Sequence, residues 1–322
     1  MMHRGRSSGS TVSSSDTWAS DVSERSLVDD SDTLWMNDSS CVKLKFSEES
    51  NEDSSRASEP KTPPPVMPPS YRNAGRQAQV TFEIVAANTV KEGPAKFVLY
   101  TVLVVRSPGI DTVEASVERR YSDFAKLNKT LIKQFPHLMK DVAFPKKMLT
   151  GNFKTETIAE RSRGFEQYLG HIYRISEIRE SLQLASFFYE SDLKSAYNYL
   201  RDERYGDALP WLIHAEQLQE RLQGLNNPSV TLSLCALVVC YHKTEQFTSA
   251  QEYADLALRS LGEKDESPLL VPLLNISIRL CWSLGMEKSD LEERLGRLRA
   301  KGIEVERALE LKDVVMKLCK LN

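Results

Sequence analysis

Residues that form covalent cross-links or hold metals are scarce in this sequence. Its 322 residues include five cysteines and five histidines, with no CxxC pair and no zinc-knuckle spacing. Four cysteines lie in apolar stretches with helical spacing, which predicts small buried side chains in a reducing compartment: Cys235, Cys240, Cys281 and Cys319. We therefore expect no metal site and no cofactor.

Long apolar runs are also missing. No window approaches the run of about 18 uncharged apolar residues that a membrane-spanning helix needs. The first ten residues, "MMHRGRSSGS", have no apolar core of the kind found in a secretory signal. We expect a soluble intracellular protein that contacts membranes only peripherally.

Motifs of known enzyme classes are absent too. The sequence has no glycine loop that cradles phosphates, no nucleophile elbow, no HExxH and no paired carboxylates beside a histidine. Each of four scattered histidines is explained by a helix face or a core position: His137, His171, His214 and His242. The sequence therefore predicts a protein that is not an enzyme.

An overall excess of positive charge is lacking, with 42 Lys and Arg against 45 Asp and Glu. This balance argues against a nucleic-acid partner. The charge is unevenly spread, however: the net value is −4 over residues 1–75, +4 over 76–190 and −3 over 191–322. A positive middle between acidic flanks suits an anionic ligand that docks at one place.

Residues 1–75 are rich in Ser, Pro, Asp and Glu and end in "PKTPPPVMPPSY". Such a segment cannot bury enough apolar area to offset the entropy of ordering, so we expect a disordered tail with a polyproline-like end. Its acidic serine clusters are candidates for phosphorylation, or they form a solvated tail with no further role.

Residues 76–191 predict an α+β fold, in which a three-stranded antiparallel sheet packs on helices. Period-two stretches "AQVTFEIVAAN", "AKFVLYTVLVVRS" and "DTVEASVERRY" read as three successive strands. A helix over "SDFAKLNKTLIKQFP" follows, with Ser122 or Asp123 as its N-cap. After a proline-containing loop come a helix over "TIAERSRGFEQYLGHIYRI" and short closing helices.

Residues 192–322 predict only helices, in pairs of tetratricopeptide type. Small and aromatic residues recur at offsets 0, 3, 9, 12, 16 and 19 in two stretches, which begin at Ala196 and Val238. This pattern lets two antiparallel helices approach closely. A third pair is degenerate, and we expect a final helix to cap the stack.

A cluster of cations and one aromatic ring is the candidate binding site. Arginine makes paired, charge-assisted hydrogen bonds to phosphate, and tyrosine lays its ring against a sugar-like ring. The candidates follow the third strand, lie in the proline loop and begin the next helix: Arg119, Arg120, Tyr121, Lys146, Lys147, Arg161 and Arg163. The alternative is a strand edge with a helix cap, a solvated loop and a surface helix residue.

The stretch "MLTGNF" places Met148 and Leu149, with Phe153, beside the loop lysines. Exposed apolar residues flanked by lysines fit a loop that dips into a bilayer interface. Packing of the same residues as a satellite of the core is the alternative.

Three motifs in order, "RRYSDF", "FPKK" and "ERSRGFEQYL", resemble the phox-homology (PX) domain over roughly residues 77–190. The helical remainder resembles the PX-associated (PXB) domain of a small branch of the sorting nexins. The resemblance implies three parts: a tail over 1–75, a PX domain over 76–191 and a PXB domain over 192–322.

The resemblance also implies a role for each matching residue in binding phosphatidylinositol 3-phosphate. Arg120 would clamp the 3-phosphate, Tyr121 would stack under the inositol ring, Lys147 would hold the 1-phosphate and Arg161 would bond the 4- and 5-hydroxyls. Arg119 and Lys146 would contribute less, and Met148 with Leu149 would insert into the membrane.

The function implied is that of an adaptor in endosomal trafficking. It would dock peripherally on the cytoplasmic face of early endosomes and recruit protein cargo through residues 192–322. The cytoplasm, plasma membrane and nucleus are further expected locations. A protein scaffold with a degenerate lipid pocket is the alternative.

Overall fold

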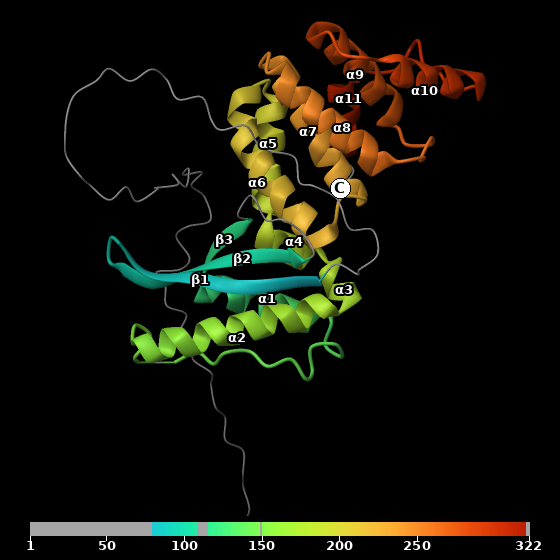
Figure 1. Cartoon of the computed structure of the whole chain (residues 1–322). Coiled ribbons are helices and arrows are strands. Elements are labelled where there is room, and N and C mark those ends of the chain that lie inside the picture. Colours follow the sequence, from blue (N-terminus) through green and yellow to red (C-terminus); the bar gives the residue numbers. More distant parts are fainter. Residues whose placement is uncertain (1–78, 108–114, 149, 320–322) are drawn as a thin grey trace, which may run out of the picture. The chain divides into compact units, whose positions relative to one another are not determined.

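The computed structural model describes residues 79–107, 115–148 and 150–319, all within one structural unit that spans 61–322 (Figure 1). The predictions for the tail over 1–75 and for Leu149 lie outside the described residues.

Three strands form one antiparallel sheet in the order β1-β2-β3, which confirms the predicted meander: β1 (Gln79–Glu92), β2 (Ala95–Ser107) and β3 (Ser116–Arg120). Alternate residues of β2 are buried, because successive side chains of a strand point to opposite faces: Val98, Tyr100, Val102 and Val104. The buried face of the sheet therefore forms one side of a hydrophobic core, and the helices that follow form the other side.

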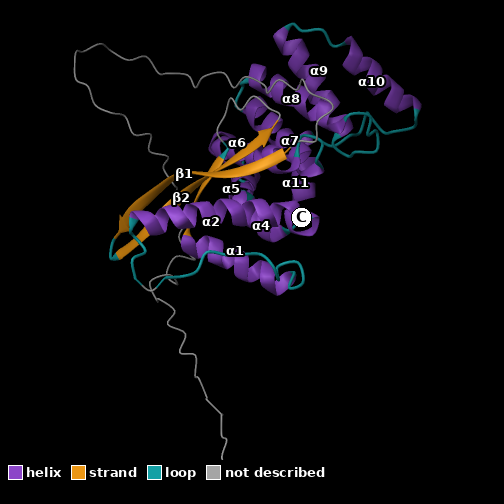
Figure 2. Cartoon of the chain, turned by 60° about the horizontal axis from the view of Figure 1, so that its bottom comes forward, coloured by secondary structure: helices purple, strands orange, loops and turns teal. Residues whose placement is uncertain are grey.

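Four helices follow the sheet: α1 (Tyr121–Gln134), α2 (Thr155–Arg174), α3 (Ser176–Arg179) and α4 (Leu182–Phe188). Figure 2 shows α1 and α2 on the same side of the sheet. Both bury the apolar face that the spacing predicts, with Phe124 and Leu131 on α1 and Phe165 and Leu169 on α2.

The start of α1 differs from the prediction. The helix begins at Tyr121, and Arg120, not Ser122 or Asp123, is its N-cap. The Asp123 carboxylate accepts a hydrogen bond from the backbone N–H of Arg120 at 2.9 Å. Asp123 therefore stabilises the helix start from the third helical position, which allows the helix to begin directly after the strand.

Seven helices complete the described chain: α5 (Glu190–Arg201), α6 (Tyr205–Gln223), α7 (Pro228–Lys243), α8 (Phe247–Leu261), α9 (Leu270–Leu284), α10 (Ser289–Ala300) and α11 (Leu311–Cys319). The first two pairs repeat in backbone detail. Glu203 and Glu245, 42 residues apart, both adopt φ of 59° in the turn between the helices of a pair. In each turn the following N–H bonds a tyrosine carbonyl at 2.9 Å, of Tyr199 or Tyr241.

Helix α6 belongs to both hydrophobic cores. Its first half, with Ala208 and Leu212, packs in the core of the helical pairs. Its second half, with Ala215, Leu218 and Leu222, packs in the core beneath the sheet. The two cores therefore share one continuous helix.

Polar contacts reinforce the junction at α6. The Arg106 guanidinium of β2 donates to the carbonyl of Arg221 at 2.9 Å, near the end of α6. Tyr173 of α2 donates from its hydroxyl to the carbonyl of Leu222. The His214 ring lies between the Asp192 carboxylate, at 2.6 Å, and the Ser116 carbonyl, at 2.8 Å.

Helix α11 does not extend the stack as an end cap. It packs against α5, α7 and α9, the first helix of each pair, and buries Leu311, Val314 and Val315. The face that these three helices share is thus partly filled by the chain's own final helix.

Candidate functional site

Arg120 lies where β3 meets α1, with its side chain 28% exposed. Its guanidinium carbon is 5.7 Å from the centre of the Phe97 ring on β2, and its Nε is 3.8 Å from the Asp123 carboxylate. A strand that passes directly into a helix fixes the backbone on both sides of this residue. The side chain is therefore held at the sheet edge while part of it stays in solvent.

Tyr121 and Arg161 contact each other although 40 residues separate them. The Arg161 guanidinium carbon lies 4.5 Å from the centre of the Tyr121 ring, a cation–π contact. The Tyr121 hydroxyl donates to the Pro145 carbonyl at 2.8 Å, so the ring bridges α2 and the proline loop. Burial raises the pKa of Tyr121, and Arg161 opposes that rise, so the hydroxyl stays protonated at neutral pH.

Arg161 is only 6% exposed, which differs from its alternative interpretation as a surface helix residue. One terminal nitrogen donates to the Asn152 side-chain oxygen at 2.8 Å. The Nε–H is buried and forms no hydrogen bond of normal geometry within the described part of the chain, although the buried Tyr100 hydroxyl lies close enough to interact with the guanidinium. An unpaired buried donor costs about 1–3 kcal/mol, so an incoming acceptor would relieve that cost.

The proline loop is anchored to α2 by a close backbone approach at Gly164. A Cβ at that position would lie 2.7 Å from Cγ of Pro145, which is closer than side chains pack. The absence of a side chain at Gly164 therefore lets the loop lie against the helix. Lys146 and Lys147 follow Pro145 directly and are both exposed.

Two apolar side chains are exposed near these lysines, Met148 at 43% and Phe153 at 41%. The Lys96 ammonium, at the start of β2 next to the turn from β1, lies 4.4 Å from the centre of the Phe153 ring. The loop and the strand turn therefore present a surface that mixes apolar and cationic groups. Such a surface can lie in a lipid interface.

Arg119 makes hydrogen bonds to α4 and not towards the other candidate residues. Its Nε donates to the Phe187 carbonyl at 2.7 Å, and a terminal nitrogen reaches the Phe188 carbonyl at 3.4 Å, both at the end of α4. Neighbouring strand residues point to opposite faces, so Arg119 leaves the sheet on the side away from Arg120. We therefore leave Arg119 out of the candidate site. Arg163, also predicted, donates to the carbonyl of Ala159 on its own helix.

Sequence reasoning missed Asn152, Gly164 and Phe97, which orient the candidate residues without carrying charge. The sequence offered a signal only for Gly164, a glycine inside a strong helical pattern. No group of His, Cys, Asp or Glu in the described residues is arranged to hold a metal ion. Over the same residues, no helix is both long and apolar enough to cross a bilayer.

A three-stranded meander, a helix that opens at Arg120-Tyr121, a proline loop and a long helix are the parts of a PX domain. The PX domain family matches residues 107–191. The chain is 38% identical to human sorting nexin-21 over 247 residues, which cover 76% of this chain and 66% of that protein. It is 37% identical to mouse sorting nexin-21 over the same length, with 68% of that protein covered.

Rat sorting nexin-20 is 36% identical over 220 residues, which cover 68% of this chain and 70% of the relative. The chain belongs to the sorting nexin family. It spans about two thirds of the length of these relatives.

Proposed function

We propose that this sorting nexin docks on the cytoplasmic face of early endosomal membranes by binding phosphatidylinositol 3-phosphate, and that residues 192–322 recruit protein cargo. We propose the corresponding domains as a PX domain over 76–191 and a PXB domain over 192–322. In this function the chain is a peripheral adaptor and not an enzyme.

The observation that carries the proposal is the buried Arg161 guanidinium with an unpaired Nε–H, stacked on Tyr121. A ligand that reaches this group must bring acceptor oxygens. The inositol hydroxyls bring such oxygens next to a phosphate, for which Arg120 supplies a partly exposed cation. Lys147 is exposed on the adjoining loop and would meet the 1-phosphate near the membrane plane.

The loop would add a membrane contact to headgroup recognition. Met148 is exposed and directly follows the lysines, and we assign insertion to Met148 and Leu149. Lys146 would add attraction to anionic lipid. A few charge-assisted bonds of about 1–3 kcal/mol each, reduced by desolvation, correspond to micromolar recognition of the headgroup.

Flotation of the full chain with vesicles tests the proposal. Vesicles that contain phosphatidylinositol 3-phosphate should float the wild-type chain, and Arg120→Ala should abolish flotation while leaving the melting temperature nearly unchanged. Arg174→Ala is the matched control, because Arg174 is exposed on α2 about 20 Å along the helix from Arg161.

Two results would reject the lipid assignment. Flotation that survives Arg120→Ala would show that the cluster is not the binding site. A wild-type chain that ignores all phosphoinositide vesicles would favour the alternative, a protein scaffold whose lipid pocket is degenerate.

A further inference from the structure

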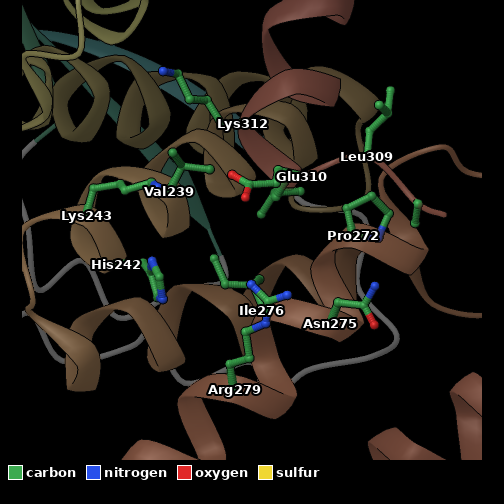
Figure 3. Close-up of a pocket in the computed structure, with 12 residues that line it drawn as sticks. Val239, His242, Lys243, Pro272, Asn275, Ile276, Arg279, Leu309, Glu310 and Lys312 are labelled. Carbon is green, nitrogen blue, oxygen red and sulfur yellow. The ribbon is translucent and has the colours of Figure 1, made fainter. Parts of the chain in front are cut away.

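A second cationic site lies among the helical pairs, far in the sequence from the PX residues. A pocket of about 100 Å³ opens between α7, α9 and the segment that leads into α11 (Figure 3). It occupies the face that the first helices of the pairs share, next to the part that α11 fills. This face is therefore not closed completely by the chain's own helix.

Two cations that line the pocket are exposed and are not held by a direct contact within the described residues. Lys243 of α7 and Arg279 of α9 are exposed, and neither has a hydrogen-bond or ion-pair partner among residues 79–107, 115–148 and 150–319. Lys312, by contrast, points away in Figure 3, and its ammonium binds the Glu203 carboxylate at 2.6 Å. The pocket thus offers two positive charges from two different helices, of which Lys243 also helps Lys312 to lower the pKa of the Glu203 carboxylate.

The pKa of His242 reflects its burial and the positive charges around the pocket. Burial lowers the pKa of its ring, and Lys243 and Arg279 lower it further, while Glu310 opposes them. The ring is therefore neutral at neutral pH. An anion placed beside it would favour the protonated form.

Apart from Asn275 and the charged residues and histidine, the lining is apolar. Val239, Pro272 and Ile276 form part of the wall, and Leu309, which also lines the pocket, is 55% exposed. A free phosphate gains nothing from such a wall, whereas a peptide that alternates acidic and apolar side chains contacts both kinds of surface. The volume suits one side chain of such a peptide and not a whole lipid headgroup.

The chain itself presents a carboxylate here. Figure 3 shows Glu310, just before α11, with its carboxylate on one side of the pocket and His242 and Arg279 reaching from the other. No ion pair holds Glu310 within the described residues, so its charge is not consumed by one partner. The position of Glu310 indicates that the pocket can accept a carboxylate. Glu310 would therefore compete with an acidic side chain of a ligand.

We propose that this pocket binds an acidic side chain of an extended segment of a partner protein, held by Lys243 and Arg279 and flanked by apolar contacts to Val239 and Ile276. The proposal deepens, and rests on, the protein-recruiting half of the proposed function. It makes no use of the PX site.

The test measures binding of a fluorescent, end-blocked peptide of alternating glutamate and leucine to the full chain, without lipid. Lys243→Gln and Arg279→Gln should each weaken binding by about tenfold, because each removes one charge that pairs with the ligand. Glu310→Gln should strengthen binding by about threefold, since it removes a competing like charge. The nuclear magnetic resonance signals of the His242 ring should move towards the protonated form as peptide is added.

Two controls define what would overturn the proposal. Lys264→Gln removes an exposed cation outside the pocket and should leave the affinity unchanged. A peptide with glutamine in place of glutamate should bind at least about tenfold more weakly. The pocket assignment is wrong if the acidic peptide fails to bind, if Arg279→Gln binds it as well as wild type does, or if the glutamine peptide binds equally well. None of these results bears on vesicle flotation, so the two halves of the function fail separately.

Discussion

The two hydrophobic cores of this chain are filled by different kinds of side chain. Beneath the sheet the core is aromatic, and the rings of Phe124 and Phe165 stack with centroids 3.8 Å apart. Among the helical pairs it is built from leucine and from fully buried small residues such as Ala236, Ala250 and Ala254. Large rings fill the space between a small sheet and its helices, whereas small residues let helix axes approach to about 8–10 Å.

This difference bears on function. The aromatic core reaches the candidate lipid site, because Tyr121 lies 6.0 Å from the Phe165 ring, centre to centre. The alanine-rich core lies among the helical pairs and meets the first core along α6. Changes in the first core should therefore disturb lipid binding, and changes in the second should not.

The largest effect is expected for Phe165→Ala. Removing a fully buried ring lowers the free energy of unfolding by about 3–5 kcal/mol. Loss of the contact with Tyr121 should also weaken vesicle binding. Denaturant unfolding of the full chain measures the first effect and flotation the second. Ile132→Ala, on the exposed side of α1, is the control, and a loss below about 1 kcal/mol for Phe165→Ala would contradict the packing described.

Overpacking the second core should cost less and leave lipid binding intact. Ala254 of α8 is fully buried, and Ala254→Leu should lower the free energy of unfolding by about 1–3 kcal/mol. Vesicle affinity should match wild type at a temperature where the variant is folded. A parallel loss of lipid binding would show that the two cores are coupled more strongly than their composition suggests.

Two glycines of α2 provide a matched pair. Gly170→Ala meets no atom within 4 Å and should stabilise the chain by about 0.5–1 kcal/mol, the usual gain in a helix. Gly164→Ala would press on Pro145 and displace the loop that carries Lys147. We expect Gly164→Ala to show no gain in stability, and its vesicle affinity to fall about fivefold, or roughly 1 kcal/mol. Equal behaviour of the two variants would argue against the anchoring role of Gly164.

The smallest effect concerns the junction between the cores. Burial opposes a charge on His214, but hydrogen bonds to Asp192 and to the Ser116 carbonyl outweigh it and raise the pKa of the ring, against the field of Arg119. The resulting stabilisation is complete below the ordinary histidine pKa and is lost as pH rises through the raised value. The ring is partly exposed, so we expect less than about 1 kcal/mol.

His214→Gln tests that expectation through unfolding measured across this pH range. The variant should lack the decline in stability that wild type shows as His214 loses its proton. Parallel pH profiles for the two proteins would mean that His214 remains neutral at the junction.

Local patterns were sufficient for much of the fold. Alternation of apolar residues predicts β1 and β2, and the spacing of Phe165, Leu169 and Ile172 predicts the buried face of α2. The shared role of α6 was not predictable, because apolar spacing does not say which core a face meets. The packing of α11 against the first helices of the pairs was not predictable either, because it depends on the path of the preceding loop.

The candidate site, like the fold, was predictable from the sequence only in part. The sequence places Arg120, Tyr121, Lys147 and Arg161 as candidates, and their joint role in lipid binding stays a prediction. Burial of Arg161 was not predictable, since it depends on Tyr121 and Asn152 closing over it from other elements. The commitment of Arg119 to the end of α4 follows from strand alternation, but only once the strand is known to extend to Arg120.

The most direct measurement is a calorimetric titration of the full chain with soluble short-chain phosphatidylinositol 3-phosphate, which isolates headgroup recognition from membrane insertion. The account predicts one site with micromolar affinity, lost in Arg120→Ala and kept in Arg174→Ala. Absence of binding by wild type, or unchanged binding by Arg120→Ala, would contradict it.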